Sequence, residues 1–175
     1  MLRRVVVLGV TGAGKSTVAG RLARLMAADH VELDAFHHGP DWVPRSDEEF
    51  AARLAGVVAL PRWVADGNYA SRVSGVLWPR ADLIVWLDLP LRVVLPRIVR
   101  RTVRRIRQRT ELWSGNRERW GALVGRGSLL WWAVTSRRRY RAVFPVLLAG
   151  VERAGVRVVR LRSTAAVEQW LAEQG

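Results

Sequence analysis

Cysteine is absent from this chain of 175 residues. Its absence excludes a disulfide framework, a thiolate metal site and a cysteine nucleophile, and it fits a reducing compartment. Long apolar runs are also missing, since no stretch approaches the roughly 18 uncharged apolar residues of a membrane-spanning helix. We therefore expect a cytoplasmic protein with no membrane partner, organised as one domain (1–175) that is large enough to bury its own core.

Lysine occurs only once. The chain has 29 lysine and arginine residues together, and Lys15 is the single lysine among them. It lies in Gly9-Val10-Thr11-Gly12-Ala13-Gly14-Lys15-Ser16, which fits the phosphate-loop pattern G-x-x-x-x-G-K-[ST]. A tight loop around a triphosphate has room for a compact ammonium but not for the wide guanidinium of arginine. Genomic base composition explains a general excess of arginine, but it does not explain why the exception falls at this position.

The motif has the flanking elements that phosphate binding requires. A β-branched run at 4–8 predicts a buried strand before it, and apolar spacing over 16–28 predicts a helix after it. The loop N–H groups and the positive end of the helix would bind phosphates, with Lys15 on the β- and γ-phosphates and the Ser16 hydroxyl on Mg²⁺. A chance match in a glycine-containing turn is the alternative. The residues predicted to bind ATP here are Gly9, Thr11, Gly12, Ala13, Gly14, Lys15, Ser16 and Thr17.

The rest of the chain alternates between strand and helix patterns. Such alternation predicts an α/β protein, a three-layer α/β/α P-loop NTPase fold with a five-stranded parallel sheet. Capping signals at Ser46 and Ser163 mark two helix starts, and Asp88 is expected to cap the helix that Pro90 begins. The expected strands are 4–8, 31–33, 63–66, 82–87 and 156–161, and the expected helices are 16–28, 46–60, 90–109, 128–149 and the segment after 163.

Two aspartates end predicted strands. Asp34 follows the second strand and Asp66 follows the third, and in open α/β sheets ligands bind at the carboxyl ends of the strands. One carboxylate is needed near Mg²⁺, usually through water, and another can orient an acceptor hydroxyl. We assign Asp66, with Ser16, to the metal and Asp34 to the acceptor. The alternative for each is an ordinary strand-end or turn residue.

Several motifs together resemble a known family. They are the phosphate loop, Glu32-Leu33-Asp34, Asp66-Gly67-Asn68-Tyr69 and Leu87-Asp88-Leu89-Pro90, with Arg97 and Arg101 behind them. Over nearly its whole length the chain resembles adenylate-kinase-like P-loop kinases, most closely a bacterial branch labelled DNA topology modulation protein. The resemblance implies that Arg97 packs on the nucleotide base, that Arg101 contacts phosphates, and that residues of about 101–127 form a lid insert.

The net charge of +14 is concentrated in the expected lid. Nine arginines between Arg97 and Arg119 face only two glutamates, and closing such arginines over a triphosphate would stabilise the transferred group. Arg109 is a catalytic candidate of this kind, as are Arg117 and Arg119. The alternative for most of the run is a solvated basic helix face.

The acceptor side departs from the adenylate kinase pattern. The residues that would hold AMP are replaced, after the second strand by the segment 34–42 and after Gly67 by Asn68 and Tyr69. We place Asp34, Asp66, Asn68 and Tyr69 on the acceptor side and leave the acceptor open. His37 and His38 are adjacent and lack a third ligand, so we expect a structural or acceptor-pocket role for them rather than a metal site.

The main hypothesis is an ATP-dependent phosphotransferase, a P-loop kinase that acts on a nucleotide, a nucleoside or another small hydroxylated acceptor with Mg²⁺. Its predicted catalytic residues are Lys15, Asp34, Arg101 and Arg109, and we expect a monomer or weak dimer. The alternative is a nucleic-acid-associated NTPase with a regulatory role in DNA topology or expression. The charge favours that alternative, but no nucleic-acid-binding motif is visible. An inactive kinase-like scaffold is a third possibility.

Overall fold

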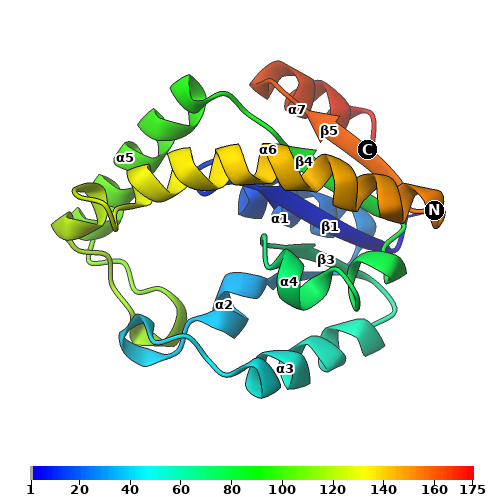
Figure 1. Ribbon diagram of the computed structural model, residues 1–175, viewed down its shortest axis with the longest axis horizontal. Coiled ribbons are helices and arrows are strands. Elements are labelled where there is room, and N and C mark those ends of the chain that lie inside the picture. Colours follow the sequence, from blue (N-terminus) through cyan, green and yellow to red (C-terminus); the bar gives the residue numbers. More distant parts are fainter. Residues whose placement is uncertain (1) are drawn as a thin grey trace.

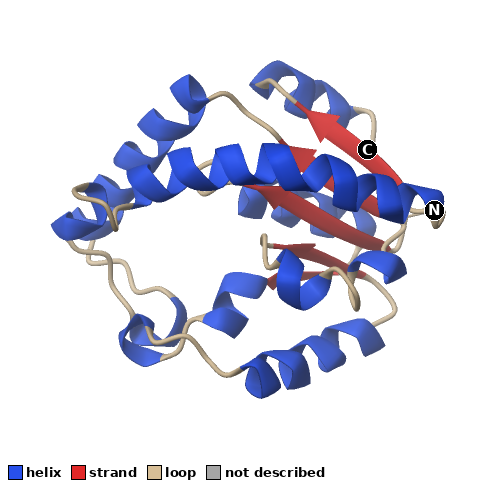
Figure 2. Cartoon of the chain, viewed as in Figure 1, coloured by secondary structure: helices blue, strands red, loops and turns tan. Residues whose placement is uncertain are grey.

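The structure is a computed structural model that describes residues 2–175. Five strands form one parallel sheet in the order β2-β3-β1-β4-β5, with helices on both faces (Figures 1 and 2). The predicted α/β fold with a five-stranded parallel sheet is therefore confirmed. The strands are β1 (Arg4–Gly9), β2 (Asp29–Glu32), β3 (Trp63–Asp66), β4 (Leu83–Leu87) and β5 (Arg157–Leu161). The helices are α1 (Lys15–Met26), α2 (Leu33–His37), α3 (Asp47–Ala59), α4 (Ala70–Val73), α5 (Leu91–Arg107), α6 (Leu129–Arg153) and α7 (Thr164–Ala172).

Strand β1 lies at the centre of the sheet, between β3 and β4. The side chains from Val5 to Leu8 are completely buried, as expected for β-branched and apolar residues covered on both faces. Each fully buried side chain of this size contributes about 1.5–3 kcal/mol. The strand ends at Gly9, which pairs with Leu87 of β4. The phosphate loop therefore leaves the sheet at its carboxyl edge, next to the ends of the neighbouring strands.

Helices from distant parts of the chain cover the two faces. Helix α6 crosses the front of the sheet in Figure 1, and its Phe144 packs edge-on against Trp86 of β4 at 5.5 Å between ring centroids. Helix α1 lies behind the sheet, and its Arg21 reaches Glu168 of α7 at 2.6 Å. No helix within residues 2–175 is both long enough and apolar enough to cross a bilayer.

Local capping signals gave correct helix starts. Ser46 and Glu49 exchange side-chain and backbone hydrogen bonds at 3.1 and 3.3 Å at the start of α3, which is the predicted capping box. Ser163 accepts a hydrogen bond from the Ala166 amide at 3.1 Å at the start of α7. In contrast, Asp88 makes no capping bond to α5. That prediction was wrong, because arginines of other elements occupy its carboxylate.

The second strand ends earlier than the sequence pattern predicts. Strand β2 stops at Glu32, and Leu33 already begins the short helix α2. Leu33 is fully buried against Gly67, and a side chain at position 67 would bring its Cβ within 2.8 Å of the Leu33 Cβ. Asp34 therefore lies in the first turn of α2 and not at the end of β2. It still lies at the same edge of the sheet as predicted.

Residues 108–128 connect α5 to α6 and contain the 3₁₀ turns Trp113–Gly115 and Trp120–Leu123. Residues 101–107 of the expected lid insert belong to helix α5, which ends at Arg107 where the sequence predicted a helix to 109. We call 108–128 the connecting segment. Figure 1 shows its tip beside the turn after α2, although the two lie far apart in the sequence.

Candidate functional site

The glycines of the phosphate loop are required by its backbone. Gly9, Gly12 and Gly14 have φ values of 152°, 78° and 97°, a region that residues with a Cβ rarely adopt. Space is short as well, because a Cβ added to Gly12 would lie 2.5 Å from the Cγ1 atom of Ile98 in α5. The loop is thus shaped by its own backbone and by the helix packed on it.

Helix α1 begins directly at Lys15. The N–H groups of a first helical turn have no partners within the helix, and with the helix dipole they favour a bound anion. The Lys15 Nζ atom lies 3.5 Å from the carbonyl oxygen of Val10, on the loop itself. Ser16 and Thr17 are exposed, and neither side chain forms a hydrogen bond within residues 2–175. Within the described part of the chain, the hydroxyl groups of Ser16 and Thr17 are therefore unpaired donors at the start of α1.

Asn68 holds the loop and does not face an acceptor. Its Oδ1 atom accepts from the Gly9 amide at 2.9 Å, and its Nδ2 atom donates to the Gly9 carbonyl at 2.6 Å. These two bonds tie the end of β3 to the first residue of the phosphate loop. The assignment of Asn68 to acceptor binding is therefore corrected, because both of its polar groups are already used.

Arg97 and Arg101 extend from α5 over the loop. Arg97 donates to the Ala13 carbonyl at 3.4 Å and to the Thr164 hydroxyl at 3.2 Å. Arg101 donates to the Thr11 hydroxyl at 3.2 Å, and its Nε atom is buried without a partner within residues 2–175. Burial, followed by the nearby Arg105, lowers the pKa of Arg101 from its very high ordinary value, while Glu118 and Asp34 oppose that change.

Arg109 is not part of the site in this conformation. It lies at the start of the connecting segment with φ at 49°, is exposed, and forms no side-chain hydrogen bond or ion pair with any of residues 2–175. Arg117 is also exposed and pairs with Glu111 at 3.6 Å. The basic run therefore divides into Arg97 and Arg101 at the loop, the partly buried Arg105, which pairs with Glu118 at 2.9 Å, and exposed arginines.

Asp34 and Tyr69 meet across two elements. The Tyr69 hydroxyl donates to the Asp34 Oδ1 atom at 2.6 Å. Burial, followed by the charge of Asp34, raises the pKa of Tyr69 far above its ordinary value, so the phenol stays a donor. The second oxygen of Asp34 forms no hydrogen bond within residues 2–175. That oxygen is available to accept a hydrogen bond from a ligand.

Asp66 does not join this pair. Its side chain is only 1% exposed, and its Oδ2 atom is 2.9 Å from the Nε2 atom of His30, beside Gly20 of α1. The hydrogen bond to Asp66 raises the pKa of His30, although burial opposes it. The Asp66 Oδ1 atom is buried and lacks a partner within residues 2–175. Asp66 therefore has an unsatisfied oxygen behind the loop, and its assignment to the acceptor side is corrected.

A buried amide joins the connecting segment to the turn after α2. Asn116 is 5% exposed, accepts from the Trp42 amide at 3.0 Å and donates to the Gly39 carbonyl at 2.8 Å. Its neighbour Trp113 stacks on His38 with ring centroids 5.7 Å apart and donates to Glu32 at 2.9 Å. We call these contacts between 113–116 and 38–42 the clasp. Sequence reasoning missed it, because no local pattern marks two loops that meet.

Asp88 lies at the end of β4 and is surrounded by cations. Arg160 donates two hydrogen bonds to its Oδ2 atom, at 2.6 and 3.2 Å. Arg141 and Arg137 of α6 lie 3.4 and 3.6 Å from the same carboxylate. These two arginines line a small hollow together with Val10 of the phosphate loop. Arg137 and Arg141 are four residues apart on α6, and no local pattern in the sequence indicates that they reach Asp88.

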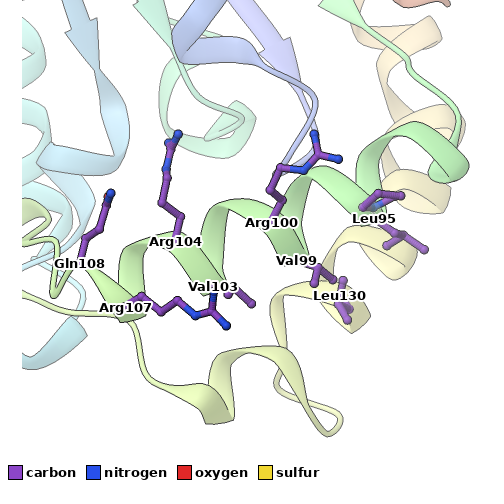
Figure 3. Close-up of a pocket in the computed structure, with 9 residues that line it drawn as sticks. Leu95, Val99, Arg100, Val103, Arg104, Arg107, Gln108 and Leu130 are labelled. Carbon is purple, nitrogen blue, oxygen red and sulfur yellow. The ribbon is translucent and has the colours of Figure 1, made fainter.

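A larger hollow lies elsewhere. It measures about 830 Å³ and follows α5, where Leu95, Val99, Val103 and Leu130 line it (Figure 3). None of Lys15, Asp34, Asp66, Arg97 or Arg101 borders it. It is an open groove without a carboxylate, so we place the site by the chemistry of its residues and not by the size of this groove.

Several solved structures share the fold of this chain, a five-stranded parallel sheet with helices on both faces. The solved structures with this fold include a shikimate kinase from Acinetobacter baumannii in complex with shikimate, at a TM-score of 0.61 and 16% identity over 99% of this chain and 90% of that one. A gluconokinase from Sinorhizobium meliloti 1021 gives 0.55 and 19% over 98% and 89%. A deoxyadenosine kinase from M. mycoides with bound dATP gives 0.56 and 11% over 97% and 98%.

Models of protein families give no match to the chain, and neither do the curated proteins. Identities this low establish the fold and not the reaction. The finer assignment to the branch labelled DNA topology modulation protein receives no support from these comparisons and stays a prediction.

Proposed function

We propose that this protein transfers the γ-phosphoryl group of ATP to a hydroxyl of a small acceptor. The observation that carries the proposal is that Arg101 connects two sites. It donates to the Thr11 hydroxyl of the phosphate loop at 3.2 Å, and the charge of Asp34 opposes the lowering of its pKa. A cation between a triphosphate loop and a carboxylate with a free oxygen is the arrangement that phosphoryl transfer requires.

Each group has a definite part in this reaction. Lys15 and the loop N–H groups hold the phosphates, and Arg101 stabilises the charge on the transferred group. Asp34 accepts a hydrogen bond from the attacking hydroxyl through its free oxygen and receives the proton as the new O–P bond forms. Tyr69 keeps the other oxygen of Asp34 engaged, so the carboxylate is held in one orientation.

The residues also fit Mg²⁺ that binds together with the triphosphate. The Ser16 hydroxyl forms no hydrogen bond within residues 2–175. The buried Oδ1 atom of Asp66 also lacks a hydrogen-bond partner within those residues, and a metal-bound water would supply that partner. Mg²⁺ keeps several waters and needs few protein ligands when phosphates are present. When bound, it neutralises charge on the β- and γ-phosphates.

The structural neighbours agree with a small acceptor. They include proteins described as kinases of shikimate, gluconate and deoxyadenosine, one of them with shikimate bound. All three names denote small hydroxylated compounds, which is the acceptor class that an open Asp34 favours.

The test is ADP release with Mg²⁺–ATP across a panel of nucleosides, nucleoside monophosphates, sugars and hydroxy acids. We expect acceptor-dependent ADP formation that Lys15→Ala abolishes and that Lys15→Arg does not restore, because the loop is too tight for a guanidinium. Arg138→Ala is the control, since Arg138 is exposed and forms no ion pair within residues 2–175. Wild-type protein that releases no ADP with any acceptor would exclude the proposal.

A nucleic-acid-associated NTPase is the second candidate. Helix α5 carries no acidic residue, and its Arg92, Arg100, Arg104 and Arg107 are exposed. A phosphate-tracking surface loses affinity steeply as salt rises. Tight, salt-dependent DNA binding that survives Lys15→Ala, together with no acceptor phosphorylation, would favour this candidate over the kinase.

A further inference from the structure

The ring of His37 has a fixed hydrogen-bonding state. Its Nδ1 atom lies 3.2 Å from the Nη1 atom of Arg72. A guanidinium can only donate, so Nδ1 must accept, and in the neutral ring the proton is on Nε2. The tautomer of His37 therefore follows from the chemistry of its partner.

Arg72 is itself held on two sides. Its Nη2 atom is 2.6 Å from the Asp47 carboxylate at the start of α3, and its guanidinium carbon lies 5.0 Å from the centre of the Phe50 ring. These contacts place the guanidinium against His37 without any ligand. Burial, followed by the charges of His38 and Arg72, lowers the pKa of His37, while Asp34 opposes this. The ring is therefore neutral at pH 7.

His37 lies next to the pair that receives the acceptor hydroxyl. It follows Asp34 by three residues on α2, so the two side chains project from the same face of the helix. Its ring centroid is 4.9 Å from that of Tyr69, whose hydroxyl donates to Asp34. The Nε2 atom of His37 forms no hydrogen bond within residues 2–175. Asp34 therefore has a free acceptor and His37 a free donor on the same face of α2.

We propose that His37 is a specificity-determining residue that donates its Nε2–H to a second oxygen of the acceptor, while Asp34 accepts from the hydroxyl that is phosphorylated. This inference rests on the proposed function and narrows the class of acceptor compounds. The acceptor class is then a compound with at least two oxygen functions near each other, such as a polyol, a sugar or a hydroxy acid. A simple alcohol satisfies Asp34 only and leaves the donor of His37 unpaired.

The first experiment needs no acceptor. Nitrogen-15 NMR of the histidine rings is simple to interpret because the chain has three histidines, and His37→Gln identifies the His37 signals. We expect a neutral ring with the proton on Nε2. Arg72→Gln should raise the pKa of His37, and Arg72→Lys, which still donates and keeps the charge, should leave the tautomer unchanged. A wild-type ring protonated on Nδ1 would overturn the inference.

The second experiment compares acceptors and variants by ADP release. Gluconate, shikimate and glycerol are set against propan-1-ol, which has a single oxygen, and against buffer without acceptor. His37→Phe keeps a ring but loses the donor, so we expect the acceptor KM to rise about tenfold with the KM for ATP unchanged, which is the effect of one lost hydrogen bond. His37→Gln, whose amide can donate, should recover part of the loss.

The two proposals fail in different ways. Acceptor-dependent ADP release that His37→Phe leaves unchanged would overturn the role of His37 and keep the phosphotransferase. Absence of ADP release with every acceptor would overturn the proposed function, and the inference about His37 would fall with it.

Discussion

The phosphate loop and the proposed acceptor cluster are built in different ways. The acceptor cluster consists of Asp34, His37, Asp47, Phe50, Tyr69 and Arg72. The loop is nine consecutive residues, 9–17, shaped by glycine backbone and completed by helix α1. The acceptor cluster draws side chains from α2, α3 and α4 and from the turn between β3 and α4, and its bonds join residues 35 apart in the chain. A local motif therefore shapes the loop that we propose to bind ATP, while long-range packing assembles the residues that we propose to bind the acceptor.

The same difference appears in how the two regions are held. The loop is supported from outside by the paired hydrogen bonds from Asn68 to Gly9. On the acceptor side, the clasp joins two segments that are more than 70 residues apart, because the buried Asn116 side chain forms hydrogen bonds with the backbone of Gly39 and Trp42. We therefore expect a mutation in one of these regions to change the properties of that region and not those of the other.

Asp34→Asn should lower phosphoryl transfer by about 10²–10⁴-fold while ATP binding stays nearly intact, because an amide cannot take the proton. Turnover is measured by ADP release, and ATP affinity by calorimetry. Tyr69→Phe is the matched variant, and it should cost less because the carboxylate remains. Equal losses of binding and turnover in Asp34→Asn would show that Asp34 supports the loop and not the acceptor.

Asn116→Ala should destabilise the clasp by about 1–3 kcal/mol, since the Trp42 amide and the carbonyl groups of Gly39 and Trp113 lose their partner. Hydrogen exchange should rise in 38–42 and 113–116 and stay unchanged in 9–17. Ser114→Ala removes only exposed bonds and serves as the milder control. Faster exchange in the phosphate loop would mean that the two regions are one cooperative unit.

Asn68→Ala should act on the opposite region. The loss of both bonds to Gly9 should weaken ATP binding about tenfold and leave the acceptor KM unchanged at saturating ATP. Asn68→Asp keeps the acceptor for the Gly9 amide but turns a carboxylate oxygen toward the Gly9 carbonyl, so we expect a comparable loss. A selective rise in the acceptor KM would restore the original assignment of Asn68 to acceptor binding.

The smallest effect concerns His30 and Asp66. The pKa of His30 is raised above 6.5 by its hydrogen bond to Asp66, so its contribution is fully present below 6.5 and is lost as the pH rises through the raised pKa. Wild type should exceed His30→Gln in unfolding free energy by on the order of 1 kcal/mol at low pH, and the difference should shrink above that pKa. Urea titrations at several pH values measure it, and a difference independent of pH would refute it.

Sequence reasoning succeeded where the signal is local. Alternating patterns gave the five strands and the helices α1, α3, α5, α6 and α7 but not the short α2 and α4, and Ser46 and Ser163 gave two helix starts. It failed where tertiary contacts decide. Leu33 was predicted to end a strand, but it begins α2 and packs against Gly67. Asp88 was predicted to cap α5, but arginines of α6 and β5 bind its carboxylate.

The site divides along the same line. The loop residues, Arg97 and Arg101 were named from the sequence, and the structure brings them together. Asn68 contacts Gly9 and Asp66 contacts His30, and neither contact was predicted, because a side chain's partner across the sheet cannot be read from its neighbours in sequence. His37 was left without a definite role, since its tautomer depends on Arg72, 35 residues away.

The sequence by itself determined that this chain has a parallel α/β sheet and a phosphate loop with its single lysine, because periodicity, glycine positions and the size of a side chain are local properties. Only the tertiary structure decided which residues surround Asp34, which arginines reach the loop and which remain in solvent, and that two distant loops close on Asn116. Those arrangements arise from packing and hydrogen bonds between residues far apart in the chain, and no local pattern encodes them.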